Sequence, residues 1–161
     1  ILFRLINNRN IISEMILMFQ KEVADRIVAE PGSKNYGILS VLTDMFAETY
    51  REISVPATCF KPAPNVDSAV LKIVFRENSL IELIDTDFFL KVVKASFAKR
   101  RKTLLNNLKT ASFLNLTVSD LESALKKIGI DGGRRGETLS TEEFGKISNV
   151  LIDNSGFESR V

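Results

Sequence analysis

CFKPAPNVDSAV, residues 59–70, joins two predicted β-strands. The flanking segments, residues 51–57 and 69–75, are rich in the β-branched and aromatic residues that favour strands. Each of the two prolines fixes its own φ and pushes the preceding residue out of helical space. We therefore predict a stiff, extended loop that leads into a strand and presents the aromatic ring of Phe60.

Upstream of this loop the chain alternates between strand and helix patterns. Residues 15–19 are consecutive apolar residues, which predicts a strand buried on both faces, as in a parallel sheet covered by helices. Apolar residues at helical spacing follow over residues 23–28 and 39–50, separated by the turn signal PGS at 31–33. These elements fit the second half of an α/β sheet that ends in an antiparallel, hairpin-like pair of strands.

The pattern becomes entirely helical in the second half of the chain. Apolar spacing predicts helices over residues 88–108, 117–128 and 141–151. We therefore predict a boundary between an α/β part, residues 1–77, and a small all-α domain, residues 78–161.

Capping residues mark the starts of two of these helices. Ser140 and Glu143 have the spacing of a capping box, and Thr117 or Ser119 could cap the helix before it. Residues 153–161 are interpreted as a frayed tail.

The composition excludes several classes of site. The 161 residues include no histidine and one cysteine, Cys59, so an internal disulfide, a zinc site of the usual ligand types and imidazole-based catalysis are not expected. No apolar run approaches the roughly 18 residues of a membrane span. A globular, cytoplasmic protein without a bound metal or a membrane segment is therefore expected.

The start of the chain indicates a fragment. It begins at Ile1 without methionine, within what looks like an amphipathic helix. We interpret the chain as part of a longer protein. The strand at residues 15–19 would then be an unpaired apolar edge, and we expect a non-native dimer or an N-terminal half that has been lost.

Positive charge is concentrated in one segment. The net charge is +2, yet residues 88–109 carry seven basic side chains and no acidic one, so the rest of the chain is acidic. The centre of this segment is Lys99, Arg100, Arg101 and Lys102. On one continuous helix, both arginines would lie at the margins of the apolar stripe and could make bidentate phosphate contacts. The alternative is an ordinary solvated basic face.

A second basic segment precedes the last predicted helix. In DGGRRG, residues 131–136, the glycines would let backbone N–H groups approach a phosphate beside Arg134 and Arg135. The alternative is a flexible connector with exposed arginines. The ring of Phe60 likewise has two readings, a platform on which a planar base stacks or a buried residue beside a proline turn.

Four segments resemble one protein family. FKPAPNVDSAV (60–70) resembles the F-x-P-x-P-x-V-D-S-A signature of the ribosomal RNA adenine dimethyltransferases. Three more segments are similar to further blocks of that family in the same order: FQKEVADRIVAEPGSKNYGILSV (19–41), FAKRRKTLLNNL (97–108) and GIDGGRRGETLS (129–140). The last two point to the small-subunit branch, the KsgA/RsmA family.

This resemblance implies a fold and an activity. The fold would be α/β, the C-terminal part of a class I Rossmann-like methyltransferase sheet followed by a small all-α domain. The full-length protein would use S-adenosylmethionine to dimethylate two adjacent adenines near the 3′ end of small-subunit (16S) rRNA, and would also act in ribosome biogenesis. Its expected partner is that rRNA in the 30S pre-ribosomal particle, and it is expected to be a monomer.

The resemblance also implies roles for particular residues. Phe60, braced by Pro62 and Pro64, would cover one side of the target adenine. The residues expected to bind RNA are Lys99, Arg100, Arg101, Lys102, Arg134 and Arg135. The Gly-rich cofactor loop and the Asn-Leu-Pro-Tyr motif of the family are absent, so no catalytic or cofactor-binding residue is expected in this chain, which alone should be inactive.

Two rival interpretations remain open. The macrolide-resistance methyltransferases, which act on large-subunit rRNA, share a similar proline segment. Alternatively, the chain is an RNA-binding or assembly module without methyltransferase activity. Cofactor binding by the purified chain would separate an enzyme from a binding module.

Overall fold

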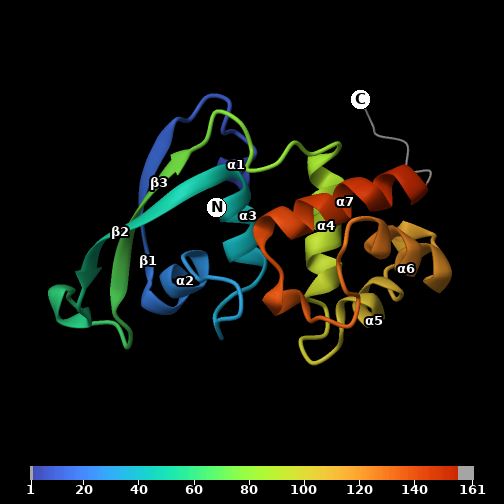
Figure 1. Ribbon diagram of the computed structural model, residues 1–161. Helices are drawn as coiled ribbons and strands as arrows, with labels where there is room; N and C mark the ends of the chain where they lie inside the picture. Colours follow the sequence, from blue (N-terminus) through green and yellow to red (C-terminus); the bar gives the residue numbers. More distant parts are fainter. Residues whose placement is uncertain (1, 156–161) are drawn as a thin grey trace. The chain divides into compact units, whose positions relative to one another are not determined.

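The computed structural model describes residues 2–155 and divides into two compact units, Ile1–Leu80 and Ile81–Val161 (Figure 1). The predicted frayed tail therefore falls in two parts. Its first residues belong to the last helix, which runs to Ser155, and residues 156–161 lie outside the described part of the chain.

The first unit is a three-stranded sheet with helices, in agreement with the predicted α/β class. Its elements are α1 (Leu2–Ile6), β1 (Glu14–Gln20), α2 (Lys21–Ile27), α3 (Ile38–Phe46), β2 (Ala47–Val55), the 3-10 turn η1 (Ala57–Cys59) and β3 (Ser68–Phe75). The strand order is β1-β3-β2, and both pairings are antiparallel. The strand that follows the proline segment is thus the central strand, and α2 and α3 lie on one face of the sheet (Figure 1).

Strand β1 is an edge strand with one covered face. Met15, Leu17 and Phe19 are half-buried, whereas Ile16 is 63% exposed and Met18 is 54% exposed. The prediction of a strand buried on both faces of a parallel sheet is therefore wrong. Within the described residues, helices cover one face only, and β1 pairs on one side, antiparallel, with β3.

The helix predicted over residues 39–50 is shorter than its apolar pattern indicated. Helix α3 ends at Phe46, and β2 begins at Ala47 without a connecting loop. Ala47 pairs with Phe75 at the end of β3, and the pairing continues along the strand. Hydrogen bonding to a distant strand therefore overrides the local helical pattern, because strand formation depends on its neighbours more than on propensity.

All regular secondary structure among the described residues of the second unit is helical. Its elements are α4 (Thr86–Ser96), α5 (Leu104–Leu108), η2 (Ser112–Leu114), α6 (Val118–Lys127), η3 (Gly136–Thr138) and α7 (Thr141–Ser155). Side chains with almost no exposure form its core: Phe88, Phe89, Val92, Val93, Leu104, Leu108, Leu121, Leu125, Phe144, Ile147 and Leu151.

Both predicted helix starts are confirmed. The backbone N–H of Glu143 donates to Ser140 Oγ at 3.1 Å, and the Ser140 N–H donates to the Glu143 carboxylate at 2.8 Å. Thr117, and not Ser119, caps α6 in a second capping box with Asp120. Each box satisfies backbone donors that the first helical turn leaves without partners.

The single helix predicted over residues 88–108 is wrong. Helix α4 ends at Ser96, residues 97–103 form a loop, and Thr103 caps the short helix α5. The ring of Phe97 lies 5.5 Å from that of Phe144 on α7. Phe97, which extends the apolar pattern in the sequence, therefore packs against α7 and does not continue α4. Consequently, Arg100 and Arg101 lie in a loop rather than at the margins of a helical stripe.

Candidate nucleic-acid interface

The proline loop, residues 56–67, carries the aromatic residue expected to contact a base. Phe60 is half-buried and has an extended backbone, with φ −113° and ψ 152°. The peptide bond between Lys61 and Pro62 is cis, and Pro62 and Pro64 are exposed. The benzyl group is therefore not sealed in the core, and a stacking role for it stays a proposal.

Asp67 closes the base of the proline loop. Its carboxylate accepts a hydrogen bond of 2.9 Å from the backbone N–H of Ala57, and its carbonyl accepts one of 2.8 Å from the N–H of Lys21. These contacts connect both ends of the loop and the start of α2. The loop geometry around Phe60 is thus held by an acidic side chain as well as by the prolines.

A hollow of about 500 Å³ lies beside the end of the proline loop. It is lined by Gln20, Lys21, Glu22, Asp25, Asn65, Val66 and Asp67. The pKa of Asp25 is lowered, because Lys21 and Arg51 donate hydrogen bonds to its carboxylate. Three carboxylates in this lining make the hollow unsuitable for a phosphate group.

The first basic loop, residues 97–103, exposes its four consecutive cations. Lys99, Arg100, Arg101 and Lys102 are all exposed. The Nε of Arg100 donates to Glu137 at 2.8 Å. Within the described residues, the side chains of Lys99, Arg101 and Lys102 make no ion pair, so these three cations are available to an external anion.

The second basic loop, residues 131–136, contains two arginines with different environments. Arg134 donates to both carboxylate oxygens of Glu143, at 2.5 and 3.1 Å, and to the carbonyl of Thr138 at 2.5 Å. Arg135 is exposed and reaches Glu137 only at 4.0 Å. Arg134 is thus engaged within the unit, whereas Arg135 remains open to solvent.

Glu143 is the acidic partner of Arg134 in the second basic loop. Burial raises the pKa of its carboxyl, but hydrogen bonds from Arg134 and from the Ser140 N–H lower it by more, so the pKa lies below its ordinary value. A carboxylate that completes a capping box and binds an arginine in bidentate geometry fixes the second basic loop to the start of α7.

Backbone contacts bring the two basic loops together. The N–H groups of Leu104 and Leu105 donate to the carbonyls of Arg134 and Gly132, at 2.7 and 3.0 Å. Since the first N–H groups of a helix have no intrahelical partner, the second loop satisfies the donors that open α5. Together with the carboxylate of Glu137, these bonds make the two segments a single basic surface.

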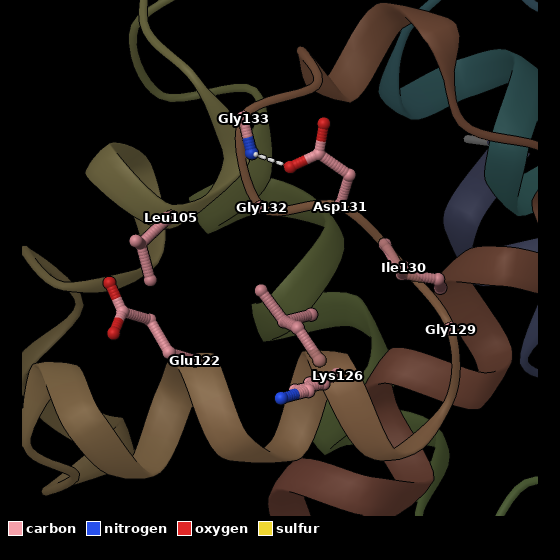
Figure 2. Close-up of a pocket in the computed structure, with 9 residues that line it drawn as sticks. Leu105, Glu122, Lys126, Gly129, Ile130, Asp131, Gly132 and Gly133 are labelled. Carbon is pink, nitrogen blue, oxygen red and sulfur yellow. Dashed lines mark hydrogen bonds between the residues drawn. The ribbon is translucent and has the colours of Figure 1, made fainter.

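A second hollow, of about 480 Å³, lies behind the second basic loop. Figure 2 shows Leu105 from α5 and Glu122 and Lys126 from α6 around it, with residues 129–133 on the opposite side. The carboxylate of Asp131 accepts a hydrogen bond of 2.8 Å from the Gly133 N–H. This bond shapes the turn that precedes the two arginines.

No helix in the described part of the chain is long and apolar enough to cross a membrane. Over the same residues, no group of three or more Cys, Asp and Glu side chains is arranged to hold a metal ion.

The family model for ribosomal RNA adenine dimethylase matches residues 1–153. The chain belongs to the ribosomal RNA adenine dimethylase family. It is 48% identical over 155 residues to a ribosomal RNA small subunit methyltransferase A of Bacillus cytotoxicus, and 46% identical to that of Bacillus mycoides. Each match covers 94% of this chain and 52% of the relative, so the chain spans about half the length of these curated relatives.

Solved structures show that this chain has the fold of part of two larger proteins. A dimethyladenosine transferase from Plasmodium falciparum matches with a TM-score of 0.76 and 24% identity, over 97% of this chain and 62% of that one. The 23S rRNA methyltransferase ErmE matches with a TM-score of 0.56 and 22% identity, over 86% and 55% of the two chains. The expected relation to the Rossmann-like methyltransferase fold is thereby confirmed.

Sequence reasoning missed three residues that organise the candidate interface. Asp67, Asn107 and Glu137 make the hydrogen bonds that hold the proline loop and the two basic loops. Glu137 lies only two residues after Arg135, so an acidic residue next to a basic pair was the available signal. Asn107 gave no signal, because its partners are backbone groups.

Proposed function

We propose that this chain supplies the target-base and RNA-binding parts of an S-adenosylmethionine-dependent rRNA adenine dimethyltransferase. The proposed substrate of the full-length enzyme is a pair of adjacent adenines near the 3′ end of small-subunit rRNA, within a 30S pre-ribosomal particle, where it would also assist assembly. Membership of the dimethylase family and the small-subunit relatives at 46–48% identity support this proposal.

The chemistry makes positioning the principal task of such an enzyme. The exocyclic amine of adenine is a weak nucleophile, because its lone pair is delocalised into the ring. The base must leave its stack and be held so that this nitrogen points at the methyl donor. Once alkylated, the nitrogen loses its proton readily, so a chain without histidine is compatible with the reaction.

Phe60 is the proposed contact to the extruded adenine. Its ring is half-buried on a loop that two prolines stiffen and Asp67 closes. Stacking of a base on an aromatic ring contributes roughly 1 to 3 kcal/mol and needs a ring that is held in place. Pro62 and Pro64 restrict the backbone next to Phe60, and thereby the direction in which the ring points.

The basic surface is the proposed contact to the RNA backbone, and the joining of its two loops is the observation on which this assignment depends. Four exposed cations are available for phosphate contacts of the sequence-independent kind: Lys99, Arg101, Lys102 and Arg135. Arg134 is proposed to act indirectly, because its guanidinium is already bound to Glu143.

The hollow beside the proline loop, which is formed by described residues, does not fit a binding site for S-adenosylmethionine. The hollow beside the proline loop has an acidic lining, but the carboxylate of Asp25 is already engaged by Lys21 and Arg51. We therefore assign no step of cofactor binding to the described residues. The methyl donor belongs to the proposal for the full-length protein only.

A second candidate function is an RNA-binding or assembly module without methyltransferase activity. It is favoured by the exposed cations of the two joined basic loops, because binding of phosphates by these side chains needs no methyl donor. Binding of a 3′-terminal fragment of small-subunit rRNA by the purified chain tests what the two functions share, and a methyl-transfer assay on the full-length protein separates them. RNA binding without cofactor binding is expected for this chain, and methyl transfer is expected only for the full-length protein. Failure to bind the rRNA fragment would contradict both.

A further inference from the structure

Asn107 is a buried polar residue at the junction of the first basic loop with helices α4 and α5. It lies on α5, and only 1% of its surface is exposed. A buried carboxamide is expected to have hydrogen-bond partners, and here all the partners of its side chain are backbone groups of residues 96–99.

The side chain of Asn107 both donates and accepts. Its Nδ2 donates to the carbonyl of Ser96 at 2.8 Å and to that of Lys99 at 3.2 Å, and its Oδ1 accepts from the Lys99 N–H at 3.2 Å. The Ser96 carbonyl is at the end of α4, where helical carbonyls lack partners. One carboxamide thus completes the end of the helix and fixes the backbone of the loop at Lys99.

The same junction is in contact with the second basic loop. A Cβ atom at Gly136 would lie 2.9 Å from the Ser96 carbonyl oxygen, so the two backbones meet closely there. The Ser96 carbonyl oxygen thus accepts a hydrogen bond from Asn107 and lies close to the backbone of Gly136. The relative position of the two basic loops depends on this arrangement.

We infer that Asn107 is a positioning residue for RNA binding, which sets the conformation in which the first basic loop presents its cations to phosphates. The inference rests on the proposed function of the basic surface. Only a neutral carboxamide can make all three bonds, because a carboxylate cannot donate to the two carbonyls. Asn107→Asp would therefore release the loop and place a negative charge next to it.

The test measures affinity of the full chain for a 3′-terminal small-subunit rRNA fragment in four variants. Asn107→Asp is expected to weaken binding about tenfold, while Asn106→Ala on the same helix, whose side chain bonds to Thr103, changes it less than twofold. In the Arg101→Ala/Lys102→Ala background, Asn107→Asp should add less than twofold, because it acts through those cations.

A measurement on the unmodified chain covers the case in which Asn107→Asp fails to fold. Amide hydrogen exchange followed by NMR should show protection at Lys99 and at the Asn107 side chain, and RNA should increase it. An unprotected Lys99 amide, unchanged affinity in Asn107→Asp, or a full tenfold loss added to the double variant would overturn the inference. If Arg101→Ala/Lys102→Ala alone leaves affinity unchanged, the proposed function of the surface fails instead.

Discussion

Arg100 and Glu137 are 37 residues apart in the chain, and the Nε of Arg100 donates a hydrogen bond of 2.8 Å to the carboxylate of Glu137. This contact joins the first basic loop to η3, directly after the second basic loop, and it places a negative charge beside the surface proposed to bind RNA. Arg135 reaches the same carboxylate at 4.0 Å. Glu137 therefore aligns the loops while reducing the positive charge available to phosphates.

Glu137→Gln should tighten RNA binding. Removing one carboxylate from a cationic surface raises the local potential, and we expect affinity to increase about threefold to tenfold at low ionic strength. Stability should change by less than about 1 kcal/mol, because exposed ion pairs contribute little. Anisotropy titrations with labelled rRNA check this, with Glu82→Gln outside both loops as the control. Weaker binding by Glu137→Gln would show that loop alignment outweighs the charge.

Glu143→Gln should change how stability depends on pH. A folded-state pKa below the ordinary 4.5 means that the ionised carboxylate stabilises the fold above pH 4.5, and that this contribution is lost as pH falls through the folded-state pKa. We expect the variant to be less stable by about 1 to 2 kcal/mol at neutral pH, because charge-assisted hydrogen bonds to Arg134 are lost.

Urea unfolding at several pH values measures this effect. The stability difference between the native chain and Glu143→Gln should be constant above about pH 5 and shrink in more acidic solution. A difference that does not depend on pH would mean that the ion pair with Arg134 contributes nothing and that only packing was lost.

Gly136→Ala should destabilise the helical unit. The added methyl group would lie 2.9 Å from the Ser96 carbonyl oxygen, and forcing backbone apart in a packed region costs about 1 to 3 kcal/mol. Gly37→Ala is the matched control, since its Cβ would meet no heavy atom within 4 Å. Thermal unfolding should show a lower Tm for Gly136→Ala and an unchanged Tm for the control. Equal Tm values would contradict the close approach of the two backbones.

Phe60→Ala in the full-length enzyme should slow methyl transfer. Loss of stacking worth about 1 to 3 kcal/mol predicts a fall in kcat/KM of roughly 5- to 150-fold, with unchanged affinity for S-adenosylmethionine. Phe60→Tyr keeps the ring and should retain most activity, and Val66→Ala is a control in the same loop. Methyl incorporation into rRNA measures the rates. Normal turnover by Phe60→Ala would remove the proposed role of the ring.

The α/β class, the order of strands and helices over residues 14–75 and the capping box of Ser140 with Glu143 could be predicted from the sequence, because they depend on local patterns. Ser140 with Glu143 is such a pattern, and so is the proline loop between two strands. The length of α3 was wrong, because Ala47 pairs with Phe75, a residue distant in sequence. The prediction that β1 is buried on both faces is also wrong, because Ile16 and Met18 are exposed.

The candidate site was predictable in its residue types but not in its geometry. The cations of residues 99–102 are visible in the sequence, yet nothing local indicates that α4 ends at Ser96. That ending depends on Asn107 and on the packing of Phe97 against Phe144. Long-range hydrogen bonds and ring contacts decide the loop, and a helical pattern carries no information about them.

The salt dependence of RNA binding tests most directly whether the two basic loops form one phosphate-binding surface. The logarithm of affinity falls with the logarithm of salt concentration, by about 0.7 to 0.9 per phosphate contact. We expect this slope to be flatter in two variants, Lys99→Ala/Arg101→Ala/Lys102→Ala in the first basic loop and Arg135→Ala in the second. A variant that combines all four substitutions should reduce the slope by the sum of the two reductions. A combined variant with the slope of the unmodified chain would contradict the account.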